Sequence, residues 1–420
     1  MDSARADILA ARQHLQQQGW IARRSEAFHH LPPPALDQWL GAQLEGGCEA
    51  PALDGSGWTL HPIHNQFGNH ASSGIHARWL DALAPAERAE LFAGLALAGQ
   101  RQAGEGEAAP FAWAQRALCR LGLRVRISAT PGREREPVWL ELRHQPRAQA
   151  EAPLLVLDVE PGVRCVLIET HERQADACRH PVAQNLHAHV RLGAGAELQH
   201  LRIVSPAADD SVAHHVHASL AAGAQYAQAL VASSSGYHLQ RSCITLEGRG
   251  ARARSAALLL AAAHKIDLQT YTRMQAAHGA SSVEALALAQ GRAQAVANAH
   301  TRIAPGADEA NVRQRLMGVP LAGSPRLVLR PHLEILHDNV QAAHGATWGA
   351  LPEDALFYAR QRGLDEARAR ALIIEGMAHA LLERCLGGED DGLLAQWLQG
   401  GWLARAIGGQ LQANAEVQHA

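Results

Sequence analysis

Glycine–alanine pairs recur through the middle of the chain at nearly constant spacing, and this spacing constrains the fold more than any other feature. The pairs are Gly195-Ala196, Gly223-Ala224, Gly250-Ala251, Gly279-Ala280 and Gly306-Ala307. They follow one another at intervals of roughly 28 residues, and repeats of about this length are typical of stacked architectures, in which neighbouring units share one core. Each pair precedes a stretch with β-strand character. Glycine suits the corners because tight turns often need a positive φ angle.

The repeat predicts a mainly β protein. Most segments from Leu154 to Ile335 alternate apolar and polar residues, which is the period of a strand. A parallel β-helix is the favoured architecture, because the many alanines suit the narrow interior of a solenoid, and a β-sandwich is the alternative. A β-helix built on six-residue repeats is not expected, because small aliphatic residues do not recur at that interval.

Helical patterns flank the β region. They cover residues 4–18, 84–98 and 110–121, whereas residues 41–75 are rich in Gly, Asn and His and are expected to be irregular. The β run is expected to stop at Pro331, and helices are expected to begin at Pro352 and Asp365, with a third over 393–407. The predicted regions are 1–105 (helical or irregular), 106–150 (helix-to-strand transition), 151–350 (β-helix core) and 351–420 (helical).

The charged residues exclude several classes of function. The 38 basic and 41 acidic residues give a net charge of −3. No nucleic-acid partner is therefore expected. Lys265 is the only lysine, and its neighbours do not form a Gly-Lys-Ser/Thr loop. The chain therefore has no nucleotide site of this kind, and any ATP chemistry must come from a partner.

Localisation follows from hydropathy and cysteine usage. The longest apolar run, Ala256 to Ala263, is too short to span a membrane, and the first residues lack the apolar core of a signal peptide. The six cysteines are scattered without a Cys-x-x-Cys pair. We expect a cytoplasmic protein with reduced thiols and no membrane partner.

Histidine clusters are the main candidates for a metal site within the repeat. His187 and His189 are expected on one strand face, as are His215 and His217, with His214 on the opposite face. Two imidazoles on one face could ligate a transition metal, but no third ligand follows at a recognised spacing. Half-exposed histidines on a solenoid wall are the favoured interpretation. His171-Glu172 with Cys178 and His180 could form a soft metal site, but a polar loop is favoured.

Signals for a self-contained enzyme are weak. The chain has no Gly-x-Ser-x-Gly motif and no cysteine beside a plausible base. Ser233-Ser234-Ser235 is most simply a turn, and an aromatic content of 4% argues against a sugar-binding groove. A β-helix enzyme that acts on a polymeric or acyl substrate remains the alternative function.

The segment after the repeat carries a specific resemblance. Its motifs are Pro331-x-Leu333-Glu334-Ile335-x-x-Asp338-Asn339-Val340, then His344-Gly345-Ala346-Thr347-x-Gly349, then Leu356-Phe357-Tyr358-x-x-x-Arg362-Gly363. This pattern resembles the C-terminal signature of the SufB/SufD family of iron–sulfur cluster assembly proteins, with the SufD branch as the closer match. Upstream, Lys265 to Thr270 and Gly19 to Phe28 are similar to other segments of the family.

The resemblance implies a right-handed β-helix with helical terminal regions and a scaffold that is not an enzyme. Such a chain would pair with a SufB-like subunit through its β-helix, dock a SufC-like ABC-type ATPase on its C-terminal helices, and could form a homodimer when isolated. The ATPase-docking residues implied are Leu356, Phe357, Tyr358, Arg362 and Gly363. On spacing alone, Phe357 and Tyr358 would be core residues.

The resemblance also implies a shared metal site. Relatives often have a cysteine two positions before the histidine, but here that position is Ala342. A thiolate is the usual protein ligand of iron–sulfur clusters, so this chain would contribute less to ligation. His344 is the candidate iron or cluster ligand, for a transient iron–sulfur cluster at the interface with the SufB-like partner. The alternative is that His344 only forms a hydrogen bond across that interface.

Overall fold

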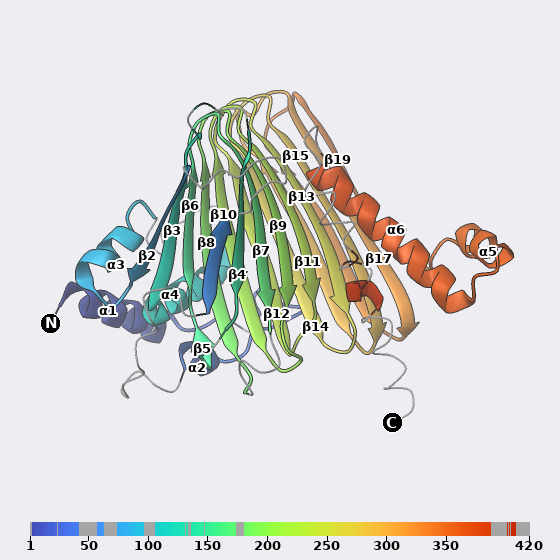
Figure 1. Ribbon diagram of the computed structural model, residues 1–420, viewed down its shortest axis with the longest axis horizontal. Helices are drawn as coiled ribbons and strands as arrows, with labels where there is room; N and C mark the ends of the chain where they lie inside the picture. The colour runs from blue at the N-terminus through green and yellow to red at the C-terminus, as the bar shows by residue number, and fades with distance from the viewer. Residues whose placement is uncertain are drawn as a thin grey trace.

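Two long β-sheets face each other and form a solenoid (Figure 1). The computed structural model describes residues 2–22, 24–41, 57–62, 74–95, 106–130, 132, 136–146, 148–173, 180–387, 401, 403 and 405–408. From β3 (Leu121–Ile127) onward the long strands alternate between the sheets and pair in parallel with one another, whereas β3 and β4 (Val138–His144) each have one antiparallel neighbour at the start of the solenoid. The prediction of a mainly β, parallel β-helix is confirmed.

The strands have the following bounds. Sheet A contains, in spatial order, β1 (Trp58–Pro62), β4 (Val138–His144), β7 (Arg164–Glu172), β9 (Glu197–Ser205), β11 (Gln225–Ser233), β13 (Arg252–Ala261), β15 (Ala280–Gly291), β17 (Ala310–Gly323) and β19 (Val340–Trp348). Sheet B contains β2 (Ile75–Asp81), β3 (Leu121–Ile127), β6 (Leu154–Val159), β8 (Ala183–Leu192), β10 (Ser211–Leu220), β12 (Tyr237–Leu246), β14 (Lys265–Met274), β16 (Gln294–Ile303) and β18 (Arg326–Ile335). The short β5 (Ala150–Glu151) pairs with β8.

The corners of the solenoid explain most of the glycine repeat. Gly195, Gly223, Gly250 and Gly306 all have positive φ angles. L side chains rarely adopt that region, so glycine is the natural residue at these corners. The fifth repeat glycine, Gly279, does not have a positive φ, and in that coil the preceding residue, His278, takes the left-handed conformation instead.

The core lies in two places. Alternate side chains of both sheets fill the interior of the solenoid, as shown by Leu167, Leu186 and Leu198, all at most 1% exposed. A second apolar layer lies on the outer face of sheet A, where Ile374 and Leu382 of the C-terminal helix α6 (Glu366–Leu386) pack on the strands. α6 is thereby fixed across that face (Figure 1).

Helices flank the solenoid at both ends of the chain. The N-terminal elements are α1 (Ser3–Gln18), α2 (Leu36–Leu40), α3 (Pro85–Leu91), a short 3-10 helix (Gly106–Ala108) and α4 (Ala109–Leu118). The C-terminal elements are α5 (Glu353–Gln361) and α6 (Glu366–Leu386). Asp2 and Asp365 cap α1 and α6 by accepting a hydrogen bond from a backbone N–H of the first turn. The predicted helical termini are confirmed, and no described helix has the length and apolar character needed to cross a membrane.

Three local predictions need correction. The 41–75 segment is not wholly irregular, because β1 lies within it and pairs antiparallel with β4. The helix predicted over 84–98 ends at Leu91. The β run does not stop at Pro331, since β18 continues to Ile335 and β19 follows. The third C-terminal helix predicted over 393–407 lies mostly outside the described residues.

Candidate functional site

The two sheets end in neighbouring strands at the C-terminal end of the solenoid. β18 is the last strand of sheet B and β19 is the last strand of sheet A, and each has a described neighbour on one side only. A strand with one neighbour leaves a row of backbone N–H and C=O groups available to another chain. This end of the molecule is therefore a natural docking surface.

The free backbone groups of β19 can be identified from its pairing. Gly349 donates its N–H to the carbonyl oxygen of Gly318 in β17 at 3.1 Å. In a parallel sheet successive residues bond to opposite sides, so the odd-numbered residues of β19 face β17. Ala342, His344 and Ala346 therefore direct their backbone N–H and C=O groups away from the sheet.

The edge of β18 differs because it contains Pro331. Arg326 and Leu336 donate their N–H groups to Ala293 and Ile303, so the even-numbered residues of β18 face β16. Pro331 is odd-numbered, and its missing N–H therefore falls on the unpaired side. A proline at that position leaves the sheet intact and blunts the free edge. β19 is the better of the two edges for pairing with another strand.

His344 lies on β19 on the side that faces the solenoid interior. Its neighbours two residues away, Ala342 and Ala346, pack against the interior core. Side chains two apart in a strand share a face. The registered partner of His344 in β17 is Gln314. His344 is nevertheless exposed, because no further described coil covers this end. Among the described residues, His344 does not belong to a group of three nearby metal-ligating side chains.

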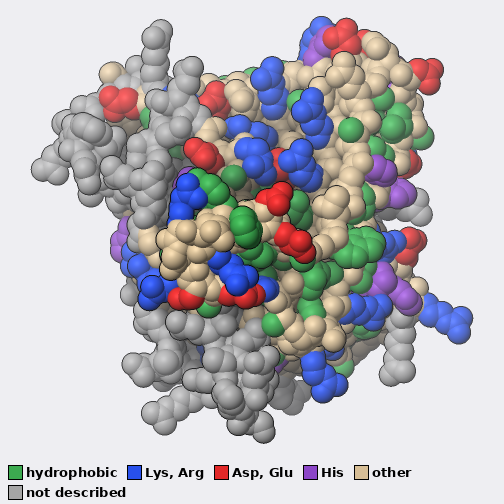
Figure 2. Space-filling model, turned by 90° about the vertical axis from the view of Figure 1, so that its right-hand side faces the viewer, with side chains coloured by type: hydrophobic (Ala, Val, Ile, Leu, Met, Phe, Trp, Pro, Cys, Tyr) green, Lys and Arg blue, Asp and Glu red, His purple; other side chains and the backbone are tan. Residues whose placement is uncertain are grey.

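Exposed apolar side chains gather at the same end. Among the described residues, the large hydrophobic side chains that are exposed lie mostly between positions 335 and 372: Ile335, Leu336, Trp348, Phe357, Tyr358 and Leu372. Figure 2 looks onto this end and shows hydrophobic side chains among Arg, Asp and Glu side chains. Exposed large hydrophobic residues interspersed with charged ones are typical of a protein–protein interface.

The residues predicted to dock the ATPase lie on and just after α5, which projects beyond the solenoid (Figure 1). Phe357 is 67% exposed and Tyr358 is 59% exposed, so the interpretation of these two residues as core is wrong. Leu356 is half-buried against the layer formed with α6. The guanidinium carbon of Arg362 lies 3.4 Å from the ring centroid of Tyr358, a cation–π contact. Gly363 ends the turn with a positive φ angle.

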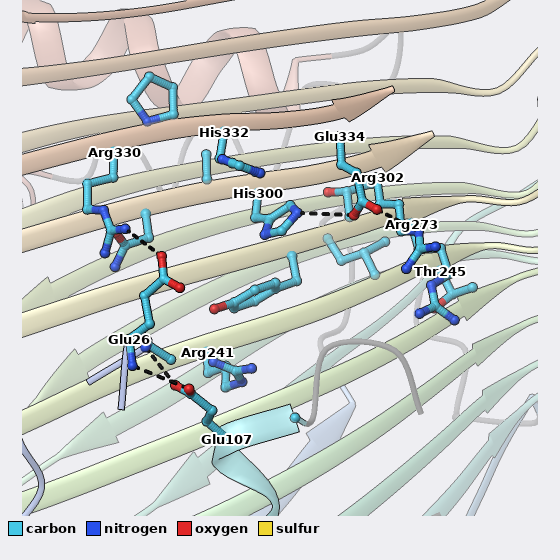
Figure 3. Close-up of a pocket in the computed structure, with 18 residues that line it drawn as sticks. Glu26, Glu107, Arg241, Thr245, Arg273, His300, Arg302, Arg330, His332 and Glu334 are labelled. Atoms are coloured by element: carbon cyan, nitrogen blue, oxygen red, sulfur yellow. Dashed lines mark hydrogen bonds and ion pairs between the residues drawn. The ribbon is translucent and has the colours of Figure 1, made fainter. Parts of the chain in front are cut away.

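A pocket of about 510 Å³ opens on the outer face of sheet B (Figure 3). Arg241, His300 and Arg330 line it from β12, β16 and β18. The N-terminal segment forms its other wall, where Glu26 pairs with Arg330 at 3.3 Å and Glu107 accepts the N–H of Ala27 at 2.7 Å. The pocket was not predicted from the sequence. The signal that could have indicated it is a set of arginines that recur at roughly the repeat length: Arg241, Arg273, Arg302 and Arg330.

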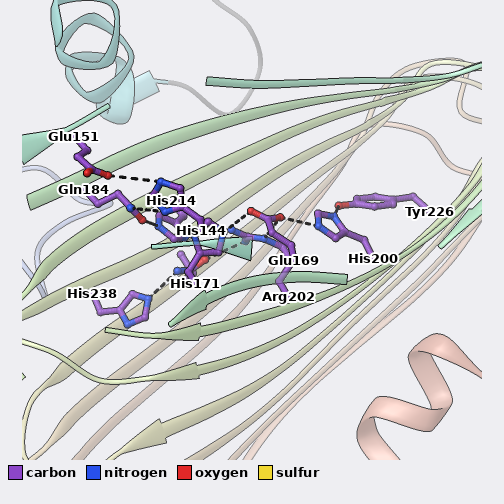
Figure 4. Close-up of polar contacts among 11 residues, drawn as sticks. His144, Glu151, Glu169, His171, Gln184, His200, Arg202, His214, Tyr226 and His238 are labelled. Atoms are coloured by element: carbon purple, nitrogen blue, oxygen red, sulfur yellow. Dashed lines mark hydrogen bonds and ion pairs between the residues drawn. The ribbon is translucent and has the colours of Figure 1, made fainter. Parts of the chain in front are cut away.

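A buried polar network occupies the solenoid interior (Figure 4). Glu169 accepts hydrogen bonds from His200 at 2.8 Å and from Arg202 at 3.1 Å, and it also contacts His171. Burial alone would raise the pKa of Glu169, but Arg202 and then His171 hold it well below its usual range. Arg202 also donates to Gln240 in the facing sheet at 3.1 Å. The ion pair therefore ties neighbouring coils and both sheets together, because a buried carboxylate needs such partners.

The histidine clusters differ from their predicted environment. His214 faces the interior, opposite to His215, as predicted. His187 and His215 are at most 3% exposed, so the expectation of half-exposed side chains is wrong for this pair. His171 lies in β7 rather than in a loop and is 4% exposed. Cys178, predicted near it, lies outside the described residues.

Burial disfavours the thiolate form of three of the four described cysteines, Cys119, Cys165 and Cys385. Cys119, Cys165, Cys243 and Cys385 are buried and lie outside disulfide bonds. Desolvation raises the pKa of Cys119 and of Cys385 to about 12. A high pKa disfavours the thiolate that a metal needs. In the part of the chain that the structure describes, no cysteine is found beside His344.

Comparisons with known proteins point to one family. The model of the SufBD core domain of the SUF iron–sulfur cluster assembly system matches residues 142–377. An iron–sulfur cluster assembly SufBD family protein of Synechocystis sp. is 26% identical over 240 residues, which is 55% of this chain and 52% of that protein. The chloroplastic protein ABCI7 of Arabidopsis thaliana is 29% identical over 120 residues, 28% of this chain and 25% of that protein.

A third relative is the iron–sulfur cluster assembly protein SufD of Escherichia coli K12. It is 39% identical over 69 residues, which is 16% of each chain. The matched segments thus span about half of the first relative and smaller parts of the other two.

Proposed function

The chain belongs to the SufBD family, and from this premise we propose that it is a non-catalytic scaffold subunit of a SUF-type iron–sulfur cluster assembly complex. The family model covers the solenoid from β6 onward and the C-terminal helices as far as residue 377, which are the parts that carry the proposed docking surface. The lone lysine leaves no P-loop, so the energy of ATP would come from a separate subunit. We place the complex in the cytoplasm, in keeping with described cysteines that lie outside disulfide bonds.

The proposed partner at β19 is a SufB-like subunit. The observation that carries this proposal is the coincidence of the open edge of β19 with the exposed apolar residues Ile335, Leu336 and Trp348. Backbone pairing would supply affinity through the outward N–H and C=O groups of β19, and the apolar residues would supply the buried area. The same edge could pair two copies of this chain when no SufB-like subunit is present.

The proposed partner at α5 is a SufC-like ABC-type ATPase. Phe357 and Tyr358 expose large side chains on a helix that stands clear of the solenoid. Aromatic side chains and arginine are the residue types that dominate binding at interfaces, and Arg362 lies against Tyr358. Leu356 anchors α5 to the layer formed with α6, so movement of the docked ATPase would be passed to the solenoid wall.

The cluster is treated as cargo held jointly with the SufB-like subunit. His344 offers one imidazole, Ala342 offers no ligand, and one donor cannot hold an iron–sulfur cluster alone. Thiolates and any carboxylate would therefore come from the partner across the β19 edge. This division explains how a chain without a suitable described cysteine at this end can still serve in cluster assembly.

Co-purification tests the proposal directly. A tagged full-length chain is expressed together with its genomic neighbours, and the bound proteins are identified by mass spectrometry. We expect a SufB-like chain and an ABC-type ATPase to be recovered in defined stoichiometry. Recovery of neither protein would overturn the proposed function, whereas recovery of the ATPase alone would remove only the assignment of β19.

A further inference from the structure

Three histidines on the outer face of sheet B bring ligating nitrogen atoms within 4.8 Å of one another. We propose that His187, His189 and His217 form a binding site for a divalent transition-metal ion. The site is separate from the proposed cluster site, because β10, β12, β14 and β16 lie between β8 and β18 in sheet B. It does not depend on the proposed function.

The parallel register builds the group. β8 and β10 align His187 with His215 and His189 with His217. Residues two apart in a strand share a face, so all four rings project from the same side of sheet B. The third ligand that sequence spacing could not supply therefore comes from the neighbouring strand, one repeat further along the chain.

The rings are arranged as a compact stack. His189 and His217 lie with ring centroids 4.9 Å apart, and His187 and His217 lie 5.7 Å apart, at interplanar angles of 18° and 21°. Nitrogen ligands of a tetrahedral ion at about 2.0–2.1 Å stand roughly 3.4 Å from each other. Metal binding would therefore require the rings of His189 and His217, which are only half-buried, to rotate and close the remaining gap.

An unpaired buried nitrogen supports the assignment. His187 is 3% exposed, and its Nε2 atom has no hydrogen-bond partner among the described residues. His215, which stacks on His187 at 4.4 Å, has an unpaired buried Nε2 atom as well. Leaving a buried polar atom without a partner is destabilising, and a bound metal ion would satisfy the nitrogen of His187.

The donor set selects the type of ion. Three imidazoles suit Zn²⁺, Co²⁺, Ni²⁺ or Cu²⁺, whereas Mg²⁺ and Ca²⁺ prefer oxygen ligands. Three protein ligands leave a fourth position open to water or to an anion. Arg241 lies close enough to His215 and His217 to influence both, and its positive charge favours an anion as the fourth ligand.

Metal titration of the isolated chain tests the site. The full-length chain, without a polyhistidine tag, is stripped with a chelator and titrated with Zn²⁺ by calorimetry and with Co²⁺ by visible absorption. We expect one ion per chain and a Co²⁺ spectrum with nitrogen ligation. His189→Gln and His217→Gln should each weaken Zn²⁺ binding by at least about tenfold.

The matched control is His300→Gln. His300 lies on the same face of sheet B and packs against His332 with ring centroids 4.4 Å apart, but it is outside the three-histidine group. This variant should bind Zn²⁺ like the wild type. Failure of the wild-type chain to bind one Zn²⁺ would overturn the proposal without any variant. Equal affinities in His189→Gln, His217→Gln and His300→Gln chains of unchanged unfolding temperature would overturn it as well.

Discussion

At the scale of single residues, the proposed docking end places the candidate ligand His344 near Ala342, which offers no ligand. His344 is exposed on the interior-facing side of β19, and Ala342 occupies the neighbouring position on the same face. A methyl group cannot bind iron, so any chemistry at this position depends on the imidazole. Cluster ligation and partner binding can therefore be tested separately, because the first depends on this side chain and the second on the backbone of β19.

Replacing His344 by Ala should lower cluster content without disturbing assembly. The side chain is exposed and lies on the last strand of its sheet, so the fold and the backbone edge of β19 should persist. We expect iron and acid-labile sulfide per complex to fall by about half or more, because one ligand is removed. Both are measured on the purified complex. Thr347→Ala, on the opposite face of the strand, is the control, and equal iron content in both variants would make His344 a structural residue.

Replacing Phe357 by Ser should weaken binding of the ATPase. An aromatic side chain at the centre of an interface is worth about 2 kcal/mol, or roughly thirtyfold in Kd. Phe357 is largely exposed in the isolated chain, so its unfolding temperature should change little. Binding is measured by titration of the purified ATPase. Leu9→Ser changes an exposed apolar residue at the other end of the chain and should leave the affinity unaltered; a Phe357→Ser chain that binds equally well would exclude this face of α5.

Single residues could be predicted from the sequence where their chemistry is local. The repeat glycines Gly195 and Gly306 do occupy corners with positive φ, because a tight turn imposes that requirement on one residue. Residues whose partners are distant could not be predicted. Glu169 and Arg202 are 33 positions apart, and only the stacking of β7 on β9 brings their charges together inside the solenoid.

At the scale of elements, the two edge strands have different properties. β18 carries Pro331, which has no backbone N–H, on its unpaired side. On the unpaired side of β19, Ala342, His344 and Ala346 each have both a backbone N–H and a C=O group. In the sequence, Pro331 predicts the end of the β run because proline removes a ladder donor. In an edge strand that donor has no partner to lose, so β18 continues to Ile335.

Ala346→Pro should block partner pairing at β19. The substitution removes one outward N–H and leaves the bonds from β19 to β17 in place, since odd-numbered residues make those bonds. We expect binding of the SufB-like subunit to weaken by about tenfold or more, while the isolated chain keeps its fold. Affinity is measured by biolayer interferometry. Ala346→Ser retains the N–H and is the control, and undiminished binding of the proline variant would mean that the partner does not pair with this edge.

The elements that could not be predicted from the sequence owe their structure to pairing over long distances. β1 is five residues long, and Trp58 is held by its alignment with His144, more than eighty positions away. No period can be read from so few residues, so a strand of this kind is invisible to pattern analysis. The long strands of the solenoid and α6, with its cap at Asp365, could be predicted more readily. Each is long enough to repeat its pattern of apolar residues several times.

At the scale of the whole molecule, the solenoid interior holds neutral histidines from several coils. Four members of the network in Figure 4 are at most 3% exposed, and desolvation lowers the pKa of each: His144, His200, His214 and His238. The pKa of His238 falls to about 4. Below a pH of about 6.5 the unfolded chain binds protons that these folded-state side chains do not bind, so the four histidines lower the stability as the pH falls. Burial raises the pKa of Asp267 to about 7, so this one group acts in the opposite direction and reduces the net effect.

Thermal unfolding should reveal this dependence. Each such histidine subtracts up to about 1.4 kcal/mol from the free energy of unfolding for every pH unit between its folded and unfolded pKa values. We therefore expect the unfolding temperature of the metal-free chain to drop steadily from pH 7 to pH 5, as followed by circular dichroism. His238→Gln removes one of these groups and should make the pH dependence shallower; a temperature that stays constant over this range would contradict the prediction.

The two ends of the solenoid are not equivalent. The sheets begin in β1 and β2, short strands that run antiparallel to their neighbours. α3 is joined to β2 by a hydrogen bond of 2.7 Å, which the backbone N–H of Asp81 donates to the carboxylate of Glu87. Short, covered or proline-containing edges resist further pairing, and β1 ends at Pro62. Polymerisation needs two reactive ends per subunit, and the described strands of this chain provide one. Contact through β19 should therefore terminate at a pair, so that a surplus of this chain would yield closed dimers rather than fibres.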